Sequence, residues 1–436
     1  MTGPSPDRAT KRRPPFGRMA MLLAVLLLGG CGGFERPAPS VPGGAETETL
    51  RFWAGEAPAS APARTLLTRP GYAQHYSVLA LSGGGPDGAY GAGLVAGLSA
   101  AGRRPDFDVV TGVSTGALMA PFVFLGPAHD AVLRELYTGP GVETLLEGGL
   151  LSLLDQPGLY RHRAIRARLE QHITPELLAA IAAEHQRGRR LYVATGNFDA
   201  QRMVVWDMGA IAARGTVQDL ILFREVLAAA MSIPVLFPLV ALPAAAEPST
   251  FPELHGDAGL FAGFYAGLEL FPVRGSEHCG RGRLKCSLYV IIHNKLLPEP
   301  ERLILRVDAI GARALQSMVK ANLNHALQAA SLATRNAGIG FHAARLRTNF
   351  PDVLPVQFDR AYMQRIYEEG FAHGRDPAVW RDIDGLLRPD LSAAQQRPWL
   401  QIAHAMTKPR SLSDLARVPQ PPRISTRKTT YADIAH

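Results

Sequence analysis

Residues 79–93 read LALSGGGPDGAYGAG, a glycine-rich loop directly behind a short apolar run. Gly83, Gly85 and Gly88 fit the pattern G-x-G-x-x-G, and Asp108 follows Gly88 by twenty residues. That spacing is typical of a dinucleotide-binding turn, in which backbone amides hold a pyrophosphate. The same amides are equally suited to hold the negatively charged oxygen that forms when an ester is cleaved. The loop alone leaves both interpretations open.

The segments around this loop alternate between strand and helix patterns. Residues 76–82 form a continuous apolar run, as in a strand buried on both faces, and residues 89–102 are small and apolar at helical spacing. Residues 107–112 and 113–124 repeat the pair. Such a unit predicts parallel neighbouring strands with a right-handed crossover, and therefore an α/β fold with a mainly parallel sheet. Further strands are expected at 190–198, 202–208 and 287–294, and long helices at 312–335 and 361–374.

A second motif, GVSTG at residues 112–116, lies where the second strand ends and the second helix begins. G-x-S-x-G in this place is typical of a nucleophile elbow, in which Gly112 and Gly116 permit a sharp turn that exposes the Ser114 hydroxyl. Because parallel neighbouring strands end at the same edge of a sheet, we expect the amides of residues 83–85 to face the atom that Ser114 attacks. The elbow favours an ester-cleaving site, since a dinucleotide site leaves it unexplained.

The composition and net charge limit the classes of protein to which the chain can belong. Of 436 residues, 47% are hydrophobic and 19% are charged, so the chain can bury a large core. The formal net charge is +8, and half of that excess lies in residues 1–30. The remainder is small for a chain of this length, and no nucleic-acid partner is expected.

The N-terminal residues 1–30 have the features of an export signal. Basic residues precede the apolar run MAMLLAVLLLGG, which is too short to span a bilayer as a lone helix. The run ends in LGGC, which resembles the lipobox of bacterial lipoproteins and predicts that Cys31 is lipidated. This resemblance implies a lipid-anchored protein of the bacterial cell envelope, at the outer membrane because no Asp follows the cysteine. An ordinary signal peptide with an incidental cysteine is the alternative.

Residues 31–75 are expected to form a flexible tether, since residues 32–70 are rich in Pro, Gly, Ala, Thr and Glu. Residues 408–436, which contain several prolines and mixed charge, predict a poorly ordered tail. The oligomeric state is not indicated by the sequence.

Cys279 and Cys286 are the remaining cysteines, seven residues apart in a polar segment. Disulfides persist in exported proteins, and we predict that the two cysteines pair. Free or metal-bound thiols are the alternative, but no second Cys or His cluster with ligand spacing lies nearby.

Three motifs in order along the chain resemble the patatin-like phospholipase family. They are the oxyanion loop GGGPDG at 83–88, the elbow GVSTG at 112–116 and the aspartate motif HGDAG at 255–259. The segments LAAAMSIPVLFP at 227–238 and MQRIYEEGFAHG at 363–374 also resemble family segments, so the likeness spans residues 77 to 374.

The resemblance implies a three-layer α/β sandwich over residues 76–407 that hydrolyses acyl esters of the phospholipid, lysophospholipid or carboxyl-ester type. It implies a catalytic dyad of Ser114 and Asp257 with no histidine between them, and no metal or organic cofactor. A carboxylate with a pKa of about 4 is a weak base, so the dyad requires a desolvated cleft that raises the pKa of Asp257. The oxyanion-binding residues carried over from the family are Gly83, Gly84, Gly85 and Gly88.

The sequence departs from the family pattern at two positions. Ala258 stands where the family has glycine, and alanine tolerates a left-handed backbone poorly, so a different turn is expected after Asp257. Asp87 stands where many relatives have a basic residue, which removes an attraction for anionic headgroups. Ester hydrolysis does not depend on that attraction.

Two alternatives to the dyad stay open. His255 or His293 would complete a Ser/His/Asp triad, although a histidine beside a strand is more often structural. Asp257 itself sits in a Gly-flanked segment, where aspartates commonly form local turns. An envelope lipoprotein that keeps the fold but binds lipid or a partner without turnover is the alternative of a different class.

Overall fold

The protein is described by a computed structural model that covers residues 50–56, 75–243, 252–271, 279, 284–297, 303, 305–346 and 358–387. All of them belong to one compact unit that ends at Leu387. The predicted signal peptide, Cys31, most of the predicted tether and the predicted tail lie outside the described residues. Among those described, no helix has both the length and the apolar character needed to cross a bilayer.

The main sheet has the strand order β1-β7-β6-β3-β2-β10-β11, with β9 beside β6 and β8 beside β9. Strands β6, β3, β2, β10 and β11 are parallel to their neighbours in that order, and the remaining pairs are antiparallel. The strand bounds are β1 Arg51–Trp53, β2 His75–Leu81, β3 Val109–Val113, β6 Arg190–Asn197, β7 Arg202–Asp207, β8 Val240–Leu242, β9 Glu253–Asp257, β10 Lys285–Ile292 and β11 Gly340–Arg345. A separate hairpin pairs β4 Glu147–Gly148 with β5 Tyr160–Arg161.

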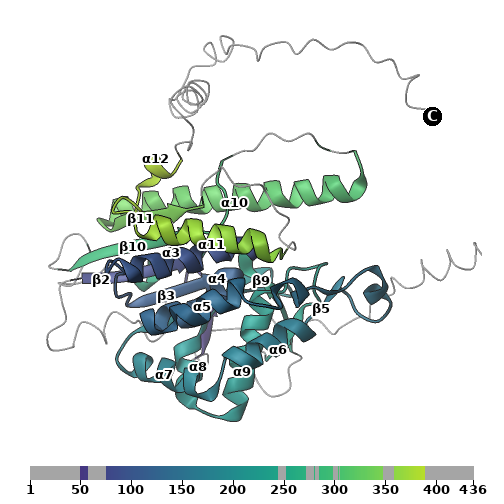
Figure 1. The fold of residues 1–436 in the computed structure, drawn as a ribbon. Helices are drawn as coiled ribbons and strands as arrows, with labels where there is room; N and C mark the ends of the chain where they lie inside the picture. The colour runs from purple at the N-terminus through teal and green to yellow at the C-terminus, as the bar shows by residue number, and fades with distance from the viewer. Residues whose placement is uncertain are drawn as a thin grey trace, which may run out of the picture. The chain divides into compact units, whose positions relative to one another are not determined.

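Both faces of the sheet are covered, which gives three layers. Leu79 and Leu81 point into one hydrophobic cluster with α3 (Gly88–Ala100), α4 (Thr115–Leu125), α9 (Val217–Ala230) and α11 (Arg360–Gly374). Val78 and Ala80 point into another with α10 (Val307–Ala337) and residues 264–271. This alternation explains the continuous apolar run of β2, because both faces are buried. The mainly parallel α/β sheet that the sequence predicts is confirmed. Figure 1 shows α3, α5 and α11 side by side on one layer.

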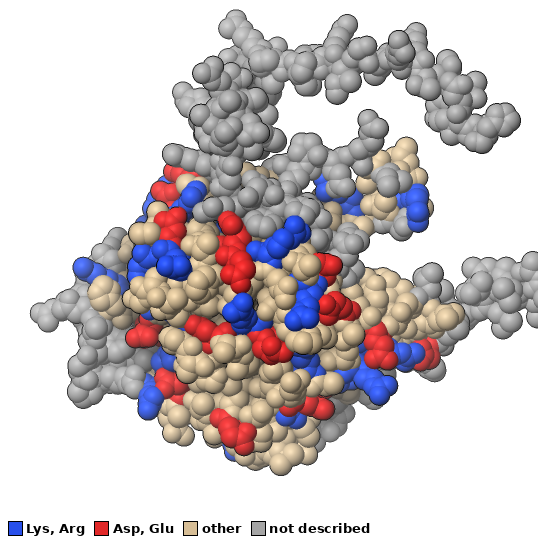
Figure 2. Space-filling model, in the orientation of Figure 1, with Lys and Arg blue, Asp and Glu red and all other residues tan. Residues whose placement is uncertain are grey.

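The helix bounds are α3 Gly88–Ala100, α4 Thr115–Leu125, α5 Asp130–Thr138, α6 Arg163–His172, α7 Pro175–Gln186, α8 Met208–Arg214, α9 Val217–Ala230, α10 Val307–Ala337, α11 Arg360–Gly374 and α12 Ile383–Leu386. On the face drawn in Figure 2, side chains of both charges are interspersed over the described residues.

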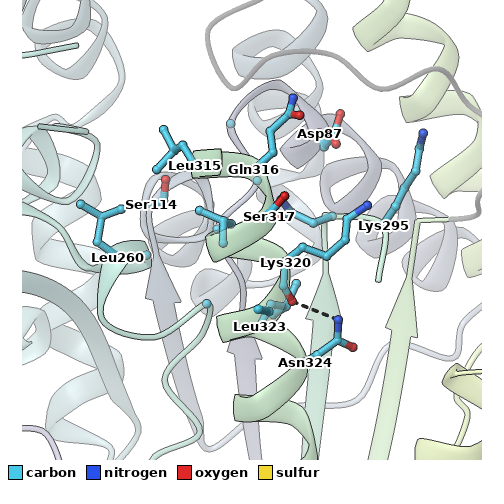
Figure 3. A pocket seen from close by; sticks show the side chains of 18 of the residues that line it. Asp87, Ser114, Leu260, Lys295, Leu315, Gln316, Ser317, Lys320, Leu323 and Asn324 are labelled. Carbon is cyan, nitrogen blue, oxygen red and sulfur yellow. Dashed lines mark hydrogen bonds between the residues drawn. The ribbon is translucent and has the colours of Figure 1, made fainter. Parts of the chain in front are cut away.

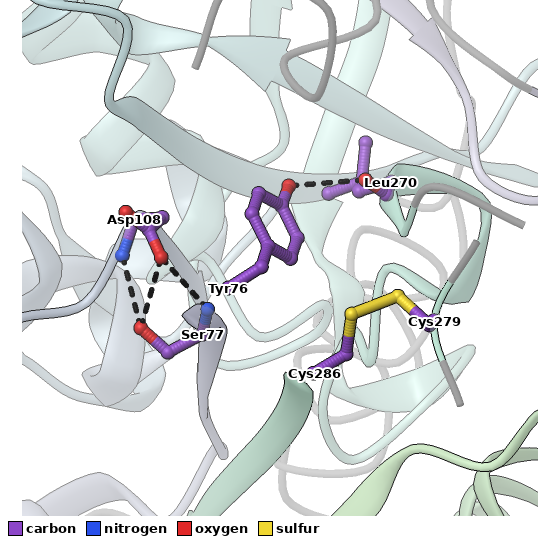
Figure 4. The surroundings of a disulfide bond; sticks show 6 residues. All are labelled: Tyr76, Ser77, Asp108, Leu270, Cys279 and Cys286. Carbon is purple, nitrogen blue, oxygen red and sulfur yellow. Dashed lines mark hydrogen bonds between the residues drawn. A yellow bond between two sulfur atoms is a disulfide. The ribbon is translucent and has the colours of Figure 1, made fainter. Parts of the chain in front are cut away.

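Cys279 and Cys286 form a disulfide with their Cα atoms 5.5 Å apart (Figure 4). Cys286 lies in β10, so the bond ties Cys279 to the first residues of this central strand. Both cysteines are buried.

Helices α3 and α11 approach so closely that their backbones touch through glycines. A Cβ at Gly93 or Gly97 would lie 2.0 or 2.2 Å from a carbonyl oxygen of α11, and one at Gly370 would lie 2.1 Å from the Tyr90 carbonyl oxygen of α3. No side chain fits between the helices at these positions. Because α3 begins directly after the glycine loop, this packing also fixes the loop.

We predict that Gly370→Ala lowers the free energy of unfolding by about 3 kcal/mol or more, because the new methyl group collides with backbone that cannot move aside. Gly311→Ala is the matched control, since a Cβ at this α10 position meets nothing within 4 Å. The control is expected to stabilise the protein by up to about 1 kcal/mol through helix propensity. Equal effects of the two variants in urea denaturation would contradict the close packing.

The N-terminal strand β1 is held by a buried ion pair. Residues 51–53 lie within the span whose composition predicts a tether, yet they pair with β7. Arg51 donates to Glu253 of β9 at 2.5 Å, and both side chains are almost fully buried. Burial alone would raise the pKa of Glu253, but hydrogen bonds from His255 and Arg51 and the charge of Arg51 outweigh it and lower that pKa to about 2.

We predict that Arg51→Met lowers the free energy of unfolding at pH 7 by about 3 to 5 kcal/mol, because it leaves a buried carboxylate without its cation. Arg51→Met/Glu253→Met removes both charges and is expected to recover most of the loss. Since the pKa of Glu253 falls from 4.5 to about 2 on folding, the stabilisation is present above pH 4.5 and is lost as the pH falls towards 2. Urea titrations between pH 2 and 7 measure this, and a single variant as stable as the wild type would refute the role of the pair.

Candidate active site

Ser114 lies at the sharp turn between β3 and α4. Its backbone has φ 54° and ψ −125°, a conformation that non-glycine residues adopt rarely. A Cβ at Gly112 would lie 2.4 Å from the Gly116 carbonyl oxygen, and one at Gly116 would lie 2.5 Å from the Leu81 carbonyl oxygen. Both glycines of the motif are therefore required by close approach of the backbone. The turn places the Ser114 side chain on the wall of a cavity.

Tyr137 of α5 locks the first residue of α4. Its hydroxyl donates to the Thr115 carbonyl oxygen at 2.7 Å and lies 2.8 Å from Thr115 Oγ1. A Cβ at Gly88 would lie 2.2 Å from the same Oγ1 atom, so the glycine loop packs directly on the elbow. The sequence analysis did not identify Tyr137, because a tyrosine on an amphipathic helix carries no signal for this contact.

The amides of the glycine loop are not equivalent. The Gly83 amide donates to the Gly263 carbonyl oxygen at 2.9 Å, and the Gly88 amide donates within its own turn to Gly85 and Pro86. The prediction that all of these residues offer amides to an oxyanion therefore does not hold for Gly83 and Gly88. For the amides of Gly84 and Gly85, no hydrogen bond is found within the part of the chain that the structure describes.

The Thr115 amide, which the sequence analysis did not single out, is a candidate for a further donor. It lies in the first turn of α4, where backbone N–H groups have no partner within the helix. The residue after the nucleophile commonly supplies such an amide in G-x-S-x-G sites. Gly84, Gly85 and Ser114 line one cavity, so the two loop residues lie on the same wall as the hydroxyl.

Asp257 ends strand β9 and lines the same cavity. Its carboxylate accepts a hydrogen bond from the Gly259 amide at 2.7 Å. Burial raises the pKa of Asp257 to about 6, although hydrogen bonds from the Ser114 side chain and the Gly259 amide lower it in part. The structure therefore brings together the hydroxyl and the carboxylate that lie far apart in the sequence.

Ala258 opens a short 3-10 turn, Ala258–Leu260, and is fully buried. The backbone φ angle of Ala258 is not positive. The turn after Asp257 therefore does not need a left-handed residue at this position, and alanine fits it.

Two residues for which the sequence predicted no role, Ser232 and His162, fix the backbone of Asp257. The Asp257 amide donates to the Ser232 carbonyl oxygen at 2.8 Å. The Ser232 hydroxyl donates to Ala228 and accepts from His162 Nε2 at 2.7 Å, so His162 carries its proton on Nε2. Burial lowers the pKa of His162 to about 4, which keeps the ring neutral at pH 7.

Neither histidine of the alternative triad lines the cavity. His293 Nδ1 donates to the Ser82 carbonyl oxygen at 2.6 Å, and burial lowers the pKa of His293 to about 4. His255 lies 2.8 Å from Thr195 Oγ1 through Nδ1 and 3.2 Å from Glu253 through Nε2. The hydrogen bonds that these rings make point away from the cavity, and the triad alternative has no support in this geometry.

Asp108 does not lie near the glycine loop. Its carboxylate accepts from the amide and hydroxyl of Ser77, at the beginning of β2 (Figure 4). The loop follows the other end of this strand, so Asp108 cannot bind a ribose whose phosphates the loop would hold. The dinucleotide interpretation is therefore wrong in its geometry. Within the described residues, no group of three or more His, Cys, Asp or Glu side chains is arranged to hold a metal.

The cavity has a volume of about 510 Å³ and lies between the elbow, the loop, the turn after β9 and α10 (Figure 3). Apolar side chains form much of its wall, among them Ile233, Leu260, Leu296, Leu315, Val319 and Leu323. A cavity of this size and lining suits a small or single-chain acyl group.

Comparison with known proteins places these residues in one family model. Residues 79–264 match the model of the patatin-like phospholipase family, a span that contains the glycine loop, Ser114 and Asp257. Among solved structures, VipD from Legionella pneumophila is similar with a TM-score of 0.35 and 12% sequence identity, covering 71% of this chain and 68% of that chain. No curated protein sequence matches the chain.

We predict that Asp257→Asn raises the free energy of unfolding at pH 8 by about 2 to 3 kcal/mol. The wild type must ionise a buried carboxyl whose pKa rises from 3.8 to about 6 on folding, so its stability falls as the pH rises through this interval. The gain should therefore be absent at pH 4 and complete above pH 6. Urea denaturation at pH 4 and pH 8 measures it, and a variant less stable than the wild type at pH 8 would contradict the desolvated carboxylate.

Proposed function

We propose that the protein is a serine hydrolase of lipid acyl esters, with Ser114 as nucleophile and Asp257 as general base. The observation that carries this proposal is that Ser114 and the buried Asp257 line one cavity, in which burial raises the pKa of the carboxylate to about 6 and the Ser114 side chain lowers it in part. The match to the patatin-like phospholipase model supports a lipid substrate. The apolar wall of the cavity supports an acyl group beside Ser114.

In the first half of the reaction, Asp257 accepts the Ser114 proton while Oγ forms a bond to the ester carbonyl carbon. The carbonyl oxygen becomes negatively charged and faces the amides of Gly84, Gly85 and Thr115, which stabilise it without reorganisation. The intermediate then expels the alcohol, which takes the proton from Asp257. An acyl group remains on Ser114.

In the second half, a water molecule gives its proton to Asp257 and attacks the acyl carbon. The carboxylic acid product leaves as Ser114 Oγ takes the proton back from Asp257. Burial serves this cycle because a carboxylate with a pKa near 6 is a better base than an exposed one with a pKa of about 4. At neutral pH it is still mostly ionised and ready to accept the proton.

We also propose that the protein is anchored in the bacterial envelope through lipidated Cys31, with the outer membrane as its location. The LGGC sequence supports this, and the disulfide between Cys279 and Cys286 is consistent with an oxidising compartment. Mass spectrometry of the N-terminal peptide would detect the attached acyl chains.

The decisive experiment combines a fluorophosphonate probe with hydrolysis of p-nitrophenyl butyrate and lysophospholipids. The wild type should be labelled at Ser114, and Ser114→Ala should lose labelling and about 10⁴-fold or more in kcat. The wild-type kcat/KM should rise with pH and reach half its maximum near pH 6, because only ionised Asp257 accepts the proton. Asp257→Asn should lose most of its activity, and the rise of kcat/KM with a midpoint near pH 6 should disappear.

Two results would contradict the proposal. Full activity of Asp257→Asn together with loss of activity in His293→Ala would favour the triad. A folded wild type that neither reacts with the probe nor hydrolyses any ester would favour a lipoprotein that binds lipid or a partner without turnover.

A further inference from the structure

The turn at residues 232–237, SIPVLF, connects Asp257 to the cavity wall. Ser232 is fully buried, and its carbonyl oxygen accepts a hydrogen bond from the Asp257 amide at 2.8 Å. The next residue, Ile233, lines the active-site cavity. A shift of Ser232 would therefore displace the carboxylate and the cavity wall together.

The backbone of this turn is strained. Val235 has φ 72°, which is rare for a β-branched residue because the side chain crowds the backbone in this conformation. The Val235 side chain is 74% exposed, so its own packing does not stabilise the turn. The Phe237 amide closes the turn by donating to the Ile233 carbonyl oxygen at 2.8 Å. Contacts from another part of the chain must hold such a conformation.

A neighbouring segment, residues 159–162, supplies these contacts. The Leu159 amide donates to the Val235 carbonyl oxygen at 3.1 Å, and the Tyr160 amide donates to the Leu236 carbonyl oxygen at 2.7 Å. Both bonds fall on the strained residue and the residue that follows it. The segment that leads into α6 therefore fixes the main chain of the turn.

The His162 side chain contacts both ends of the turn. Its Nε2 donates to the Ser232 hydroxyl at 2.7 Å, and its ring stacks on Phe237 with the ring centroids 5.6 Å apart and an interplanar angle of 12°. The Ser232 hydroxyl must accept from His162, because it donates its own proton to the Ala228 carbonyl oxygen at 2.6 Å. The histidine thus fixes the peptide that holds Asp257.

We propose that His162 is a positioning residue for Asp257 that acts through Ser232. This inference rests on the proposed function, because it takes Asp257 as the general base. His162 does not line the active-site cavity, so it acts on the base and not on the ester. Its hydrogen bond fixes Ser232, which fixes the main chain of Asp257 and with it the distance of the carboxylate from the nucleophile.

The test compares two substitutions that separate the hydrogen bond of His162 from its ring. His162→Phe keeps a ring against Phe237 and removes the donor, whereas His162→Gln keeps a donor close to the position of Nε2 and removes the ring. His162→Phe should lower kcat for p-nitrophenyl butyrate by about 10- to 100-fold, the loss expected when a reacting group moves by up to about 1 Å. KM should change less, and His162→Gln should retain most of the wild-type kcat.

The pH profile distinguishes positioning from a loss of folded protein. Titration of active sites with the fluorophosphonate probe corrects kcat for any unfolded fraction, and such a fraction does not move the midpoint of the profile. A displaced carboxylate is better hydrated, so in His162→Phe the half-maximum of kcat/KM should fall from near pH 6 towards the ordinary carboxyl value of about 4. Equal losses in His162→Phe and His162→Gln, or a loss that disappears after the correction, would overturn the positioning role.

His172→Phe is the matched control. His172 belongs to α6 and does not line the active-site cavity, and its buried Nε2 has no hydrogen-bond partner among the described residues. The substitution therefore removes a buried histidine without removing a hydrogen bond from Nε2. It should leave kcat, KM and the midpoint of the pH profile unchanged, and circular dichroism melts verify that each variant is folded.

Stability measurements test the link between His162 and Asp257 without turnover. Asp257→Asn should stabilise the wild type at pH 8, because the buried carboxyl no longer ionises, and should stabilise His162→Phe less, because its carboxyl is better hydrated. Such coupling in a protein that hydrolyses no ester would refute the proposed function and leave the link intact. Additive effects in an active enzyme whose kcat is unchanged by His162→Phe would overturn the positioning role alone.

Discussion

Ser114 adopts a backbone conformation that costs about 1 to 3 kcal/mol for a residue with a side chain, and the rest of the site depends on its being held there. Gly112 and Gly116 allow β3 and α4 to meet at this turn with no Cβ between them. Tyr137 fixes the following peptide by its hydrogen bond to the Thr115 carbonyl oxygen. The same turn places Ser114 on the cavity wall and begins α4, whose first amides have no partner within the helix.

A second constraint is the burial of the Asp257 carboxylate. Desolvation makes the carboxylate a stronger base and at the same time makes its charged form unfavourable, so the surrounding structure must hold it in place. Two supports are visible. The Asp257 amide is bound by Ser232, which His162 fixes in turn, and β9 is tied to β1 through Glu253 and Arg51. These contacts stabilise the fold and so offset the free-energy cost of ionising the buried Asp257 carboxyl group.

The sequence alone predicts the central strands, the crossover helices and the elbow, because apolar runs and glycine spacing are local signals. It does not predict a contact whose two residues lie far apart in the sequence. The direction of the Gly83 amide depends on Gly263, and the three-residue strand β1 is too short to show a period. Lys295 and Lys320 look in the sequence like ordinary solvated charges, and only the fold brings them to one wall of the cavity. For Asp108 the sequence is misleading in the opposite way. Its spacing from the glycine loop fits a dinucleotide site, but its carboxylate binds Ser77 near the beginning of β2, whereas the loop follows the end of that strand.

His293 shows why a histidine close to the site does not act as its base. The ring donates from Nδ1 to the Ser82 carbonyl oxygen, and its Nε2 faces Gly91, where a Cβ would lie only 2.2 Å away. Ser82 in turn donates to the Gly83 carbonyl oxygen, so the ring supports the glycine loop from behind. A neutral ring suffices for this purpose, because one proton on Nδ1 makes the hydrogen bond and burial disfavours the charged form. In the proposed mechanism the proton transfer therefore falls to Asp257 of β9, which lines the cavity with Ser114.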